Sequence, residues 1–357
     1  MKIYNIISTI FAVSVFSSCQ NEIPFDIKEN SPKLVVNAMI DINREDNFIF
    51  VSKTGKDRGS SVNDALINIY INDELREQLT EFILPDSVFF GDSVYFYVYD
   101  YNYNDKRYKT GLLFHPGDKV KIEVFADNDK YHAWAEDIIP KPLEIDNIDT
   151  MSFSKDYRTQ IRLKTTFTDF PNEKNFYRLV VVQKNNLKII ITEEEIENNI
   201  LYSEYEEAIY LDTRQDPILN NGRVSTDDDI FPQAENRFAV FDDKQLNTTY
   251  TMTTNFSRPD NYYYNTIGIN NFIERVAVDY KVHLISITEM QYYYLKALNT
   301  FYSDSYDEYL SMPVAFPSNV QGGVGFVGFS AGTYKTFTIP DIIPDQNDGG
   351  YGEMRKP

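Results

Sequence analysis

The feature that most constrains the fold of this chain is a series of short runs in which apolar and polar residues alternate. In the run at 115–127 (HPGDKVKIEVFAD), a Pro-Gly-Asp turn is followed by Val120, Ile122 and Val124. A period of two residues places these three side chains on one face of a strand. Similar runs lie at 32–40, 47–55, 65–73, 93–103 and 131–140. Short strands about every 12 residues, with turn residues between them, predict an immunoglobulin-like β-sandwich over residues 33–140.

The aromatic content favours a mainly β fold, and the net charge argues against one class of partner. The 357 residues include 27 Tyr, 25 Phe and one Trp, together 15% of the chain. Tyr and Phe favour the half-buried, pleated surface of a sheet. The formal net charge is −20, and no basic stretch is present that would neutralise a phosphate backbone. The composition therefore predicts no nucleic-acid partner, and it does not indicate a reaction.

The second half of the chain predicts another β-rich domain, at 145–343. A segment with two prolines at 139–149 (IPKPLEIDNID) indicates the junction between the two domains. Strand-like runs follow at 161–170, 175–186, 188–193, 237–243 and 249–256. Asn185-Asn186 predicts a hairpin turn, because Asn tolerates the left-handed backbone region. A capping pattern at Thr192 predicts a short acidic helix over 193–209.

One longer helix is predicted near 287–302, where Ser286 and Glu289 form a capping box. Apolar residues recur there at helical spacing: Tyr294, Leu295, Leu298, Phe301 and Tyr302. The Gly-rich, β-branched segment at 316–340 predicts a closing strand pair. The polar tail at 344–357 predicts a flexible end.

The first eighteen residues predict a signal peptide. Lys2 supplies a basic start, an apolar stretch runs from about Ile6 to Phe16, and two serines precede Cys19. This stretch is shorter than the ~20 apolar residues that span a bilayer. Small-Ser-Cys resembles a bacterial lipobox, in which the Cys is acylated, for example with palmitate, and becomes the new N-terminus. The alternative is an ordinary secretory signal followed by an incidental Cys.

Cys19 is the only Cys in the chain. The mature protein therefore has no disulfide to stabilise it and depends on its core and sheet pairing. Residues 19–32 are mainly polar, with two prolines, and predict a tether between the lipid and the first strand.

The best enzyme-like motif is a literal G-x-S-x-G at 328–332 around Ser330. A nucleophile elbow requires a strand before the Ser, a helix after it and a downstream His. Here the following residues are β-like, and His115, His132 and His283 all lie upstream. The alternative interpretation is that small residues let a strand pack tightly against the preceding helix.

Metal ligands and catalytic carboxylates give weak signals. Asp127, Asp129 and the run 227–229 are acidic candidates for Ca²⁺, but they lack the spacing of an EF-hand loop. His132 lies in an alternating strand beside Trp134 and fits a sheet residue. The sequence therefore predicts no metal site and no cofactor.

Two aromatic clusters are candidates for recognition. One is Tyr95, Phe96, Tyr97, Tyr99, Tyr101 and Tyr103; the other is Tyr262, Tyr263 and Tyr264, beside a predicted loop at 259–261. Tyr buries a large area at low entropy cost and keeps a polar tip, which suits a binding surface. Alternate Tyr residues on a strand can equally cover a core. We take Tyr262, Tyr263 and Tyr264 as the candidate contact with a ligand or partner.

The whole pattern resembles a family of Bacteroidota outer-membrane lipoproteins classed as a domain of unknown function. The resemblance is carried by Cys19 and by six stretches: 32–40, 116–125, 139–146, 236–243 (NRFAVFDD), 287–298 and 316–332 (FPSNVQGGVGFVGFSAG). It implies no catalytic residue. Because members are commonly encoded beside TonB-dependent receptors, it implies an accessory lipoprotein in uptake across the outer membrane, partnered by such a receptor and held to the membrane by its lipid anchor.

Three functional hypotheses follow. The first is a non-catalytic binding or accessory component of a TonB-dependent uptake system. The second is a surface glycan or peptide hydrolase that uses unrecognised carboxylates, and the third is a structural or adhesive surface module. The family resemblance favours the first.

Overall fold

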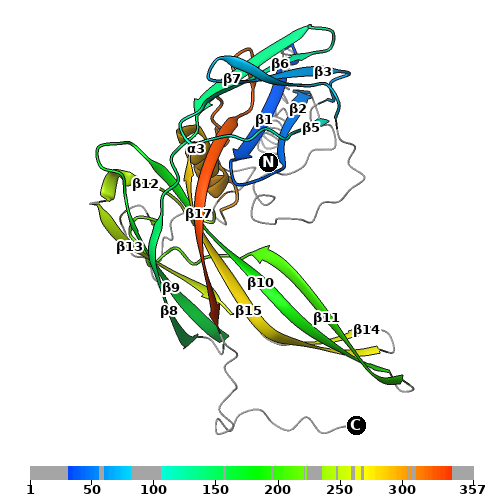
Figure 1. The fold of residues 1–357 in the computed structure, drawn as a ribbon, viewed down its shortest axis with the longest axis vertical. Helices are drawn as coiled ribbons and strands as arrows, with labels where there is room; N and C mark the ends of the chain where they lie inside the picture. The colour runs from blue at the N-terminus through cyan, green and yellow to red at the C-terminus, as the bar shows by residue number, and fades with distance from the viewer. Residues whose placement is uncertain are drawn as a thin grey trace, which may run out of the picture. The chain divides into compact units, whose positions relative to one another are not determined.

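A computed structural model gives the fold (Figure 1), and it describes residues 31–55, 60–82, 106–155, 158–193, 196–220, 222, 235–246, 248–258, 262–266, 269–303, 306 and 311–339. For residues 187, 189–201, 262–266 and 269–277 it describes the backbone alone. Several predictions fall outside the described residues: the signal peptide, the lipidation of Cys19, the tether up to residue 30, the strand at 93–103 with its aromatic cluster, the Asp run at 227–229 and the tail at 344–357.

The first part of the described chain forms two sheets that share one hydrophobic core. One sheet has the order β4-β3-β6-β7, and the other sheet contains β1, β2 and β5. These strands are β1 (Leu34–Asp41), β2 (Asn47–Lys53), β3 (Ala65–Ile71), β4 (Glu74–Leu79), β5 (Lys106–Thr110), β6 (Lys119–Ala126) and β7 (Tyr131–Ile138). Val120, Ile122 and Val124 of β6 are fully buried, and the residues between them are partly exposed. The predicted mainly β, sandwich-type fold is confirmed.

The last strand, β17 (Val327–Ile339), completes this first core. Its start pairs in parallel with β1, from Ala38↔Val327 to Asp41↔Ser330. Val327, Phe329 and Ala331 pack in the same core as β1 and β6. The core of the N-terminal sandwich therefore draws on residues far beyond 33–140.

The segment at 316–340 does not form the closing strand pair that the sequence predicts. β16 (Gly323–Val324) pairs with β1, and β17 pairs with β1 and then antiparallel with β15 (Ile269–Ile287). The prediction is wrong because both strands find partners distant in sequence rather than each other. One ten-stranded sheet, whose central path is β11-β10-β15-β17-β1-β2-β5, results from this pairing.

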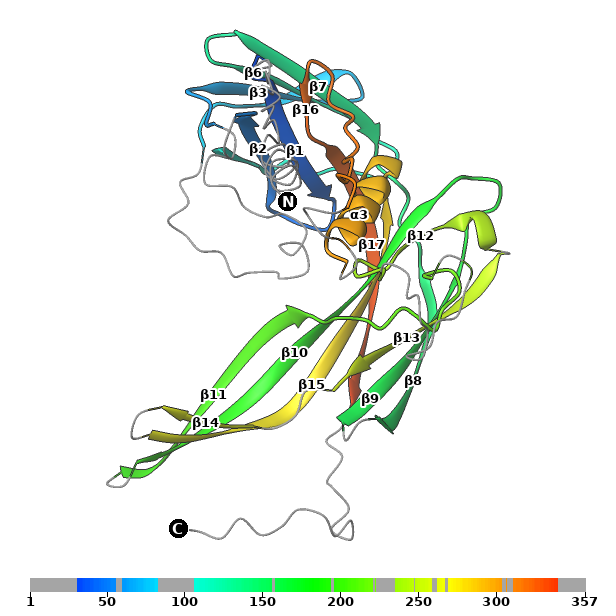
Figure 2. The ribbon, with the colours of Figure 1, turned by 180° about the vertical axis from the view of Figure 1, so that it is seen from behind.

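A second core lies between this sheet and a three-stranded sheet of order β13-β9-β8. The strands are β8 (Ile145–Lys155), β9 (Arg158–Thr168), β10 (Phe176–Glu193), β11 (Ile196–Ala208), β12 (Val240–Asp242), β13 (Thr249–Ser257) and β14 (Tyr262–Thr266). Leu163 and Phe167 of β9 pack there with Tyr177 of β10 and Leu284 of β15. Beyond this core, β11, β10, β15 and β14 continue side by side as a long ribbon (Figure 2).

The helix α3 (Glu289–Phe301) confirms the prediction near 287–302, but its cap differs. β15 extends to Ile287, so Ser286 is a buried strand residue and Thr288 is the N-cap. The predicted capping box is therefore wrong. Tyr292, Leu295 and Leu298 form the buried face of α3, in a third core with residues of β10, β12 and β15.

Two further local predictions are wrong. Asn185 and Asn186 do not form a turn but lie inside β10, where the register to β15 shifts between Asn186 and Leu187. The segment 196–208, predicted as part of an acidic helix, is β11 and pairs with β10 from Val182↔Ala208 onward. In both places pairing with neighbouring strands satisfies the hydrogen-bonding groups of the main chain. This pairing overrides the local preference of Asn for a turn and of Glu for a helix start.

Candidate functional site

A pocket of about 550 Å³ lies where the edge of β10 changes its partner. Residues 176–178 of this edge pair with β12, and β11 begins to pair at Val182. Between these partners, the Leu179 N–H donates to the Ala239 carbonyl at 3.1 Å, and the Ile209 N–H donates to the Val181 carbonyl at 2.9 Å. The segments around Ala239 and Ile209 then diverge from each other, and the pocket lies between them.

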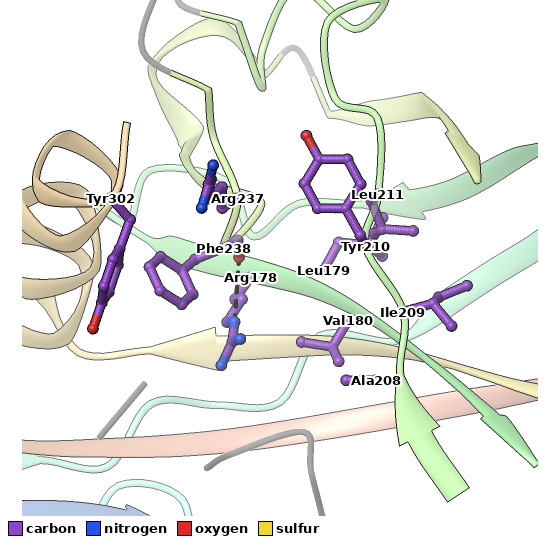
Figure 3. Close-up of a pocket in the computed structure, with 10 residues that line it drawn as sticks. All are labelled: Arg178, Leu179, Val180, Ala208, Ile209, Tyr210, Leu211, Arg237, Phe238 and Tyr302. Carbon is purple, nitrogen blue, oxygen red and sulfur yellow. Dashed lines mark hydrogen bonds between the residues drawn. The ribbon is translucent and has the colours of Figure 1, made fainter. Parts of the chain in front are cut away.

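The pocket walls are mainly apolar and aromatic (Figure 3). Its lining comprises Arg178, Leu179, Val180, Ala208, Ile209, Tyr210, Leu211, Arg237, Phe238 and Tyr302. Phe238 and Tyr302 lie on one side, and Tyr210, Leu211 and Ile209 lie on the other. Val180 and Phe238 are buried, whereas Tyr210 is 52% and Tyr302 36% exposed. The pocket thus combines a buried apolar floor with two tyrosines at its mouth, an arrangement suited to an apolar group that carries polar atoms.

Two arginines adjoin the aromatic wall. The buried Arg178 donates from Nε to the Phe238 carbonyl at 3.2 Å, and its Cζ lies 5.6 Å from the centroid of the Phe238 ring. Arg237 is more exposed, with its Nε 3.9 Å from Oε2 of Glu235. Arg178 therefore holds Phe238 in place by a hydrogen bond and a cation–π contact.

Two asparagines fix the same wall to α3. Asn236 Nδ2 donates to the carbonyls of Leu219 (2.9 Å) and Val240 (2.8 Å), and its Oδ1 accepts from Asn299 Nδ2 at 2.9 Å. Asn299 of α3 also accepts a hydrogen bond from the Phe238 N–H at 3.2 Å. Asn299 is buried and Asn236 is partly buried, and their network fixes the path of the chain from 236 to 240.

The same network accompanies an unusual backbone conformation at Ala239. Its φ is +46°, in the left-handed region that residues other than Gly rarely adopt. The Ala239 N–H donates to the Asn236 carbonyl at 3.0 Å. This N–H therefore turns away from the edge of β10.

A second, polar cavity of about 310 Å³ lies on the other side of the asparagine network. Lys296 Nζ donates to the Tyr292 hydroxyl at 3.2 Å, and Lys244 forms an ion pair with Asp242 at 2.9 Å. Burial and then the charge of Asp242 raise the pKa of Tyr292. These side chains bind one another, which makes the first pocket the better candidate for a ligand.

The structure does not bring the predicted contact residues to this pocket. Tyr262, Tyr263 and Tyr264 lie in strand β14 and pair with Ile273, Phe272 and Asn271 of β15, and the predicted loop at 259–261 lies outside the described residues. The pocket floor pairs with β15 about ten residues further along that strand, at His283 and Leu284, within the cores and outside the ribbon. The side chains of the three tyrosines are outside the described part of the structure.

The serine motif lies inside β17. Ser330 is 2% exposed, and its hydroxyl donates to the Ile40 carbonyl at 3.4 Å. A Cβ on Gly328 would lie 2.9 Å from Cβ of Gln291 on α3. The motif therefore lets a strand pack tightly against a helix, and its serine is not on a nucleophile elbow.

Two of the acidic and histidine candidates, Asp127 and His132, have structural partners. Asp127 forms an ion pair with Lys53 at 2.6 Å and accepts from the Asn63 N–H at 2.7 Å. His132 of β7 stacks on Phe125, with ring centroids 4.5 Å apart. Within the described residues, no group of three or more His, Cys, Asp and Glu is placed to hold a metal.

Sequence reasoning missed the pocket, although one signal pointed toward it. The stretch 236–243 supports the family resemblance and contains Asn236, Arg237 and Phe238, but its alternation predicts only a strand. The structure places the strand β12 at Val240–Asp242 and uses the preceding residues as a pocket wall. Tyr302 carries only the helical spacing of the segment near 287–302, and Tyr210 carries no local signal; only the fold brings the two together.

Comparisons with known proteins give a family and no named relative. The model of a domain of unknown function, DUF4249, matches residues 20–336. No curated protein matches the chain. One solved structure, described as manganese lipoxygenase of Gaeumannomyces graminis with a partial zonadhesin of Komagataella pastoris, shares 10% identity, with 86% of this chain and 96% of that chain covered. Its TM-score of 0.12 indicates no shared fold.

Proposed function

The chain belongs to the DUF4249 family of unknown function, and on this premise we propose that it is an outer-membrane lipoprotein and a non-catalytic binding component of a TonB-dependent uptake system. In this proposal residues 1–18 are removed, Cys19 is acylated, and residues 19–32 tether the folded part to the membrane. A TonB-dependent receptor is the proposed partner, as the family resemblance implies.

The observation that carries the proposal is the start of the family match at residue 20, directly after Cys19. This start supports a mature chain whose first residue is the lipidated Cys. Among the described residues, no helix has the length and apolarity needed to cross a bilayer. The net charge of −20 disfavours docking of the folded part onto anionic headgroups, so that it would project from the membrane.

The pocket beside β10 supports a binding role. Its apolar floor, its few polar groups and its fixed wall are typical of a preformed ligand site. The burial of Ser330 argues against hydrolysis by the one serine motif. A lipid anchor would also confine protein and receptor to the same membrane, so that a modest affinity suffices for high occupancy.

Replacement of the proposed lipid site tests the anchor. We expect Cys19→Ser to move the protein from the membrane fraction to the soluble fraction, with loss of labelling by radioactive palmitate. Ser18→Ala keeps a small residue before the Cys and serves as the matched control, which should stay in the membrane fraction. Unchanged detergent partitioning of Cys19→Ser would refute the anchor.

Affinity purification of the tagged protein from detergent-solubilised outer membrane tests the partner. We expect a TonB-dependent receptor to be recovered with the tagged protein. Recovery of no receptor, under conditions that retain other lipoprotein–receptor pairs, would refute the accessory role.

A further inference from the structure

The edge of β10 presents main-chain groups to the pocket as well as side chains. In a regular antiparallel ladder, a hydrogen-bonded pair of residues exchanges two hydrogen bonds. Leu179 donates to Ala239, but the reciprocal donor, the Ala239 N–H, goes to the Asn236 carbonyl instead. Leu179 lines the pocket although its side chain packs in the second core. In a strand the carbonyl of a residue points to the same edge as its N–H, so the Leu179 carbonyl points to the edge that faces Ala239, where its ladder partner has turned away.

This interruption of the ladder is part of a fixed arrangement. Ala239 adopts the left-handed region although it is not Gly, and Asn236 and Asn299 hold the residues on both sides of it. Strained conformations persist where the surrounding structure fixes them, and they concentrate at binding sites. The opening in the β10 edge is thus preformed rather than an irregular end of β12.

The side-chain walls complete a site with two kinds of recognition. The pocket offers about 550 Å³ between Phe238 and Tyr302 on one side and Ile209 and Tyr210 on the other. That volume accommodates a side chain as large as Leu or Phe. Sheet edges recognise extended peptides in this way, with main-chain hydrogen bonds for affinity and a pocket for a side chain.

We propose that this pocket binds a short extended peptide through one large apolar side chain and one main-chain amide that donates to the Leu179 carbonyl. The inference rests on the proposed binding role of the protein and names its ligand class. Tyr210 and Tyr302, at the mouth of the pocket, contact the apolar side chain of the ligand.

Calorimetric titration tests the proposal. It uses the full chain carrying Cys19→Ser, which lacks the proposed lipid anchor and can be studied without detergent. The probes are acetyl-Ala-Phe-Ala-amide, acetyl-Ala-Leu-Ala-amide and acetyl-Ala-Ala-Ala-amide. We expect the Phe and Leu peptides to bind about tenfold more tightly than the Ala peptide, because only they fill the pocket. Replacing the amides of the Phe peptide by esters, one at a time, should weaken binding about fivefold at one position, where the donor to Leu179 is lost.

A pair of tyrosine variants locates the site. Tyr210→Ala should weaken binding of the Phe peptide about tenfold. Tyr202→Ala on β11 removes a tyrosine that is 75% exposed and does not line the pocket, and it should leave binding unchanged. Equal affinity for the three peptides, no binding of any of them, or an equal loss in both variants would overturn the proposal.

The outcomes separate this inference from the proposed function. Absence of peptide binding, together with recovery of the receptor from the membrane, would overturn the peptide ligand and leave the accessory role intact. Peptide binding without receptor recovery would support the ligand class and refute the partner.

Discussion

Strands β1 to β7 of the N-terminal sandwich have between five and eight residues, whereas β10 and β15 run for 18 and 19 residues. In the sandwich, β6 buries alternate residues along its whole length, and β1 does so from Leu34 to Ile40. In β10, the described residues that belong to a core end at Val182. The next residues are polar, and Gln183 and Asn185 both donate to Oε1 of Glu207, at 2.6 and 3.2 Å.

The difference separates two ways of stabilising a β-sheet. The sandwich depends on apolar area removed from water between two sheets, so its free energy of unfolding is sensitive to single buried side chains. Among the described side chains of the ribbon, polar pairs between strands such as Gln183 with Glu207 add to the main-chain ladder, and such pairs individually contribute less. Strand β17 takes part in both regions, because its first residues pair with β1 and its later residues pair with β15.

Removal of β17 gives the largest expected effect. A chain ending at residue 315 lacks Val327, Phe329 and Ala331, which are part of the first core. It also lacks the strand β17 that pairs with β15. We expect the N-terminal sandwich to fail to fold even though residues 33–140 are intact, as measured by near-UV circular dichroism and resistance to proteolysis. A chain ending at residue 343 is the control and should fold. A protease-resistant sandwich in the shorter chain would contradict this dependence.

Single substitutions on β17 sharpen the contrast along one strand. Phe329 is fully buried in the first core, and Phe329→Ala should lower the free energy of unfolding by about 3–5 kcal/mol. Tyr334, on the same strand, is 61% exposed, and Tyr334→Ala should cost less than about 1 kcal/mol. Urea denaturation of both variants measures the two values. Equal losses would show that burial does not distinguish the two halves of β17.

The ion pair between Asp127 and Lys53 predicts a smaller, pH-dependent effect in the sandwich. Burial acts to raise the pKa of Asp127, but the Lys53 ammonium and the Asn63 N–H outweigh it and hold this pKa below its ordinary value of 3.8. The native state therefore takes up this proton less readily than the unfolded chain. The resulting stabilisation is present above the ordinary pKa and is lost as the pH falls through the lowered one.

We expect Asp127→Asn to lower the free energy of unfolding by about 1–2 kcal/mol at pH 7 and to have a smaller effect at about pH 2, below the ordinary pKa of the carboxyl group. Asp129→Asn changes an exposed residue of the same turn and should have little effect at either pH. Denaturation at both pH values measures the difference. A loss that is equal at both would rule out the ion pair as its cause.

The smallest effect is expected on the ribbon. Tyr202 of β11 is 75% exposed, and Tyr202→Ala should change the free energy of unfolding by no more than about 0.5 kcal/mol. Thermal unfolding of this variant beside Phe329→Ala makes the comparison direct. A loss comparable to that of Phe329→Ala would show that the ribbon, too, depends on buried apolar area.

Local patterns in the sequence predict much of the secondary structure. The alternation at 115–127 gives β6, and the helical spacing near Leu295 gives α3, because both periods follow from backbone geometry alone. The failures at Asn185 and at 193–209 occur where a weak local preference competes with a long ladder. The strand pairing there spans β11, β10 and β15, and no short window of sequence contains it.

By itself, the sequence determined that this protein is mainly β, with one long helix and a lipobox-like start. Only the tertiary structure decided that β17 completes the first core and that the pocket forms between Phe238, Tyr302 and Tyr210. The physical reason is that a side-chain period is a local property of the backbone, whereas a strand's partner is set by the contacts of the whole chain. The pocket depends on such a choice of partner, since it lies where the edge of β10 passes from β12 to β11.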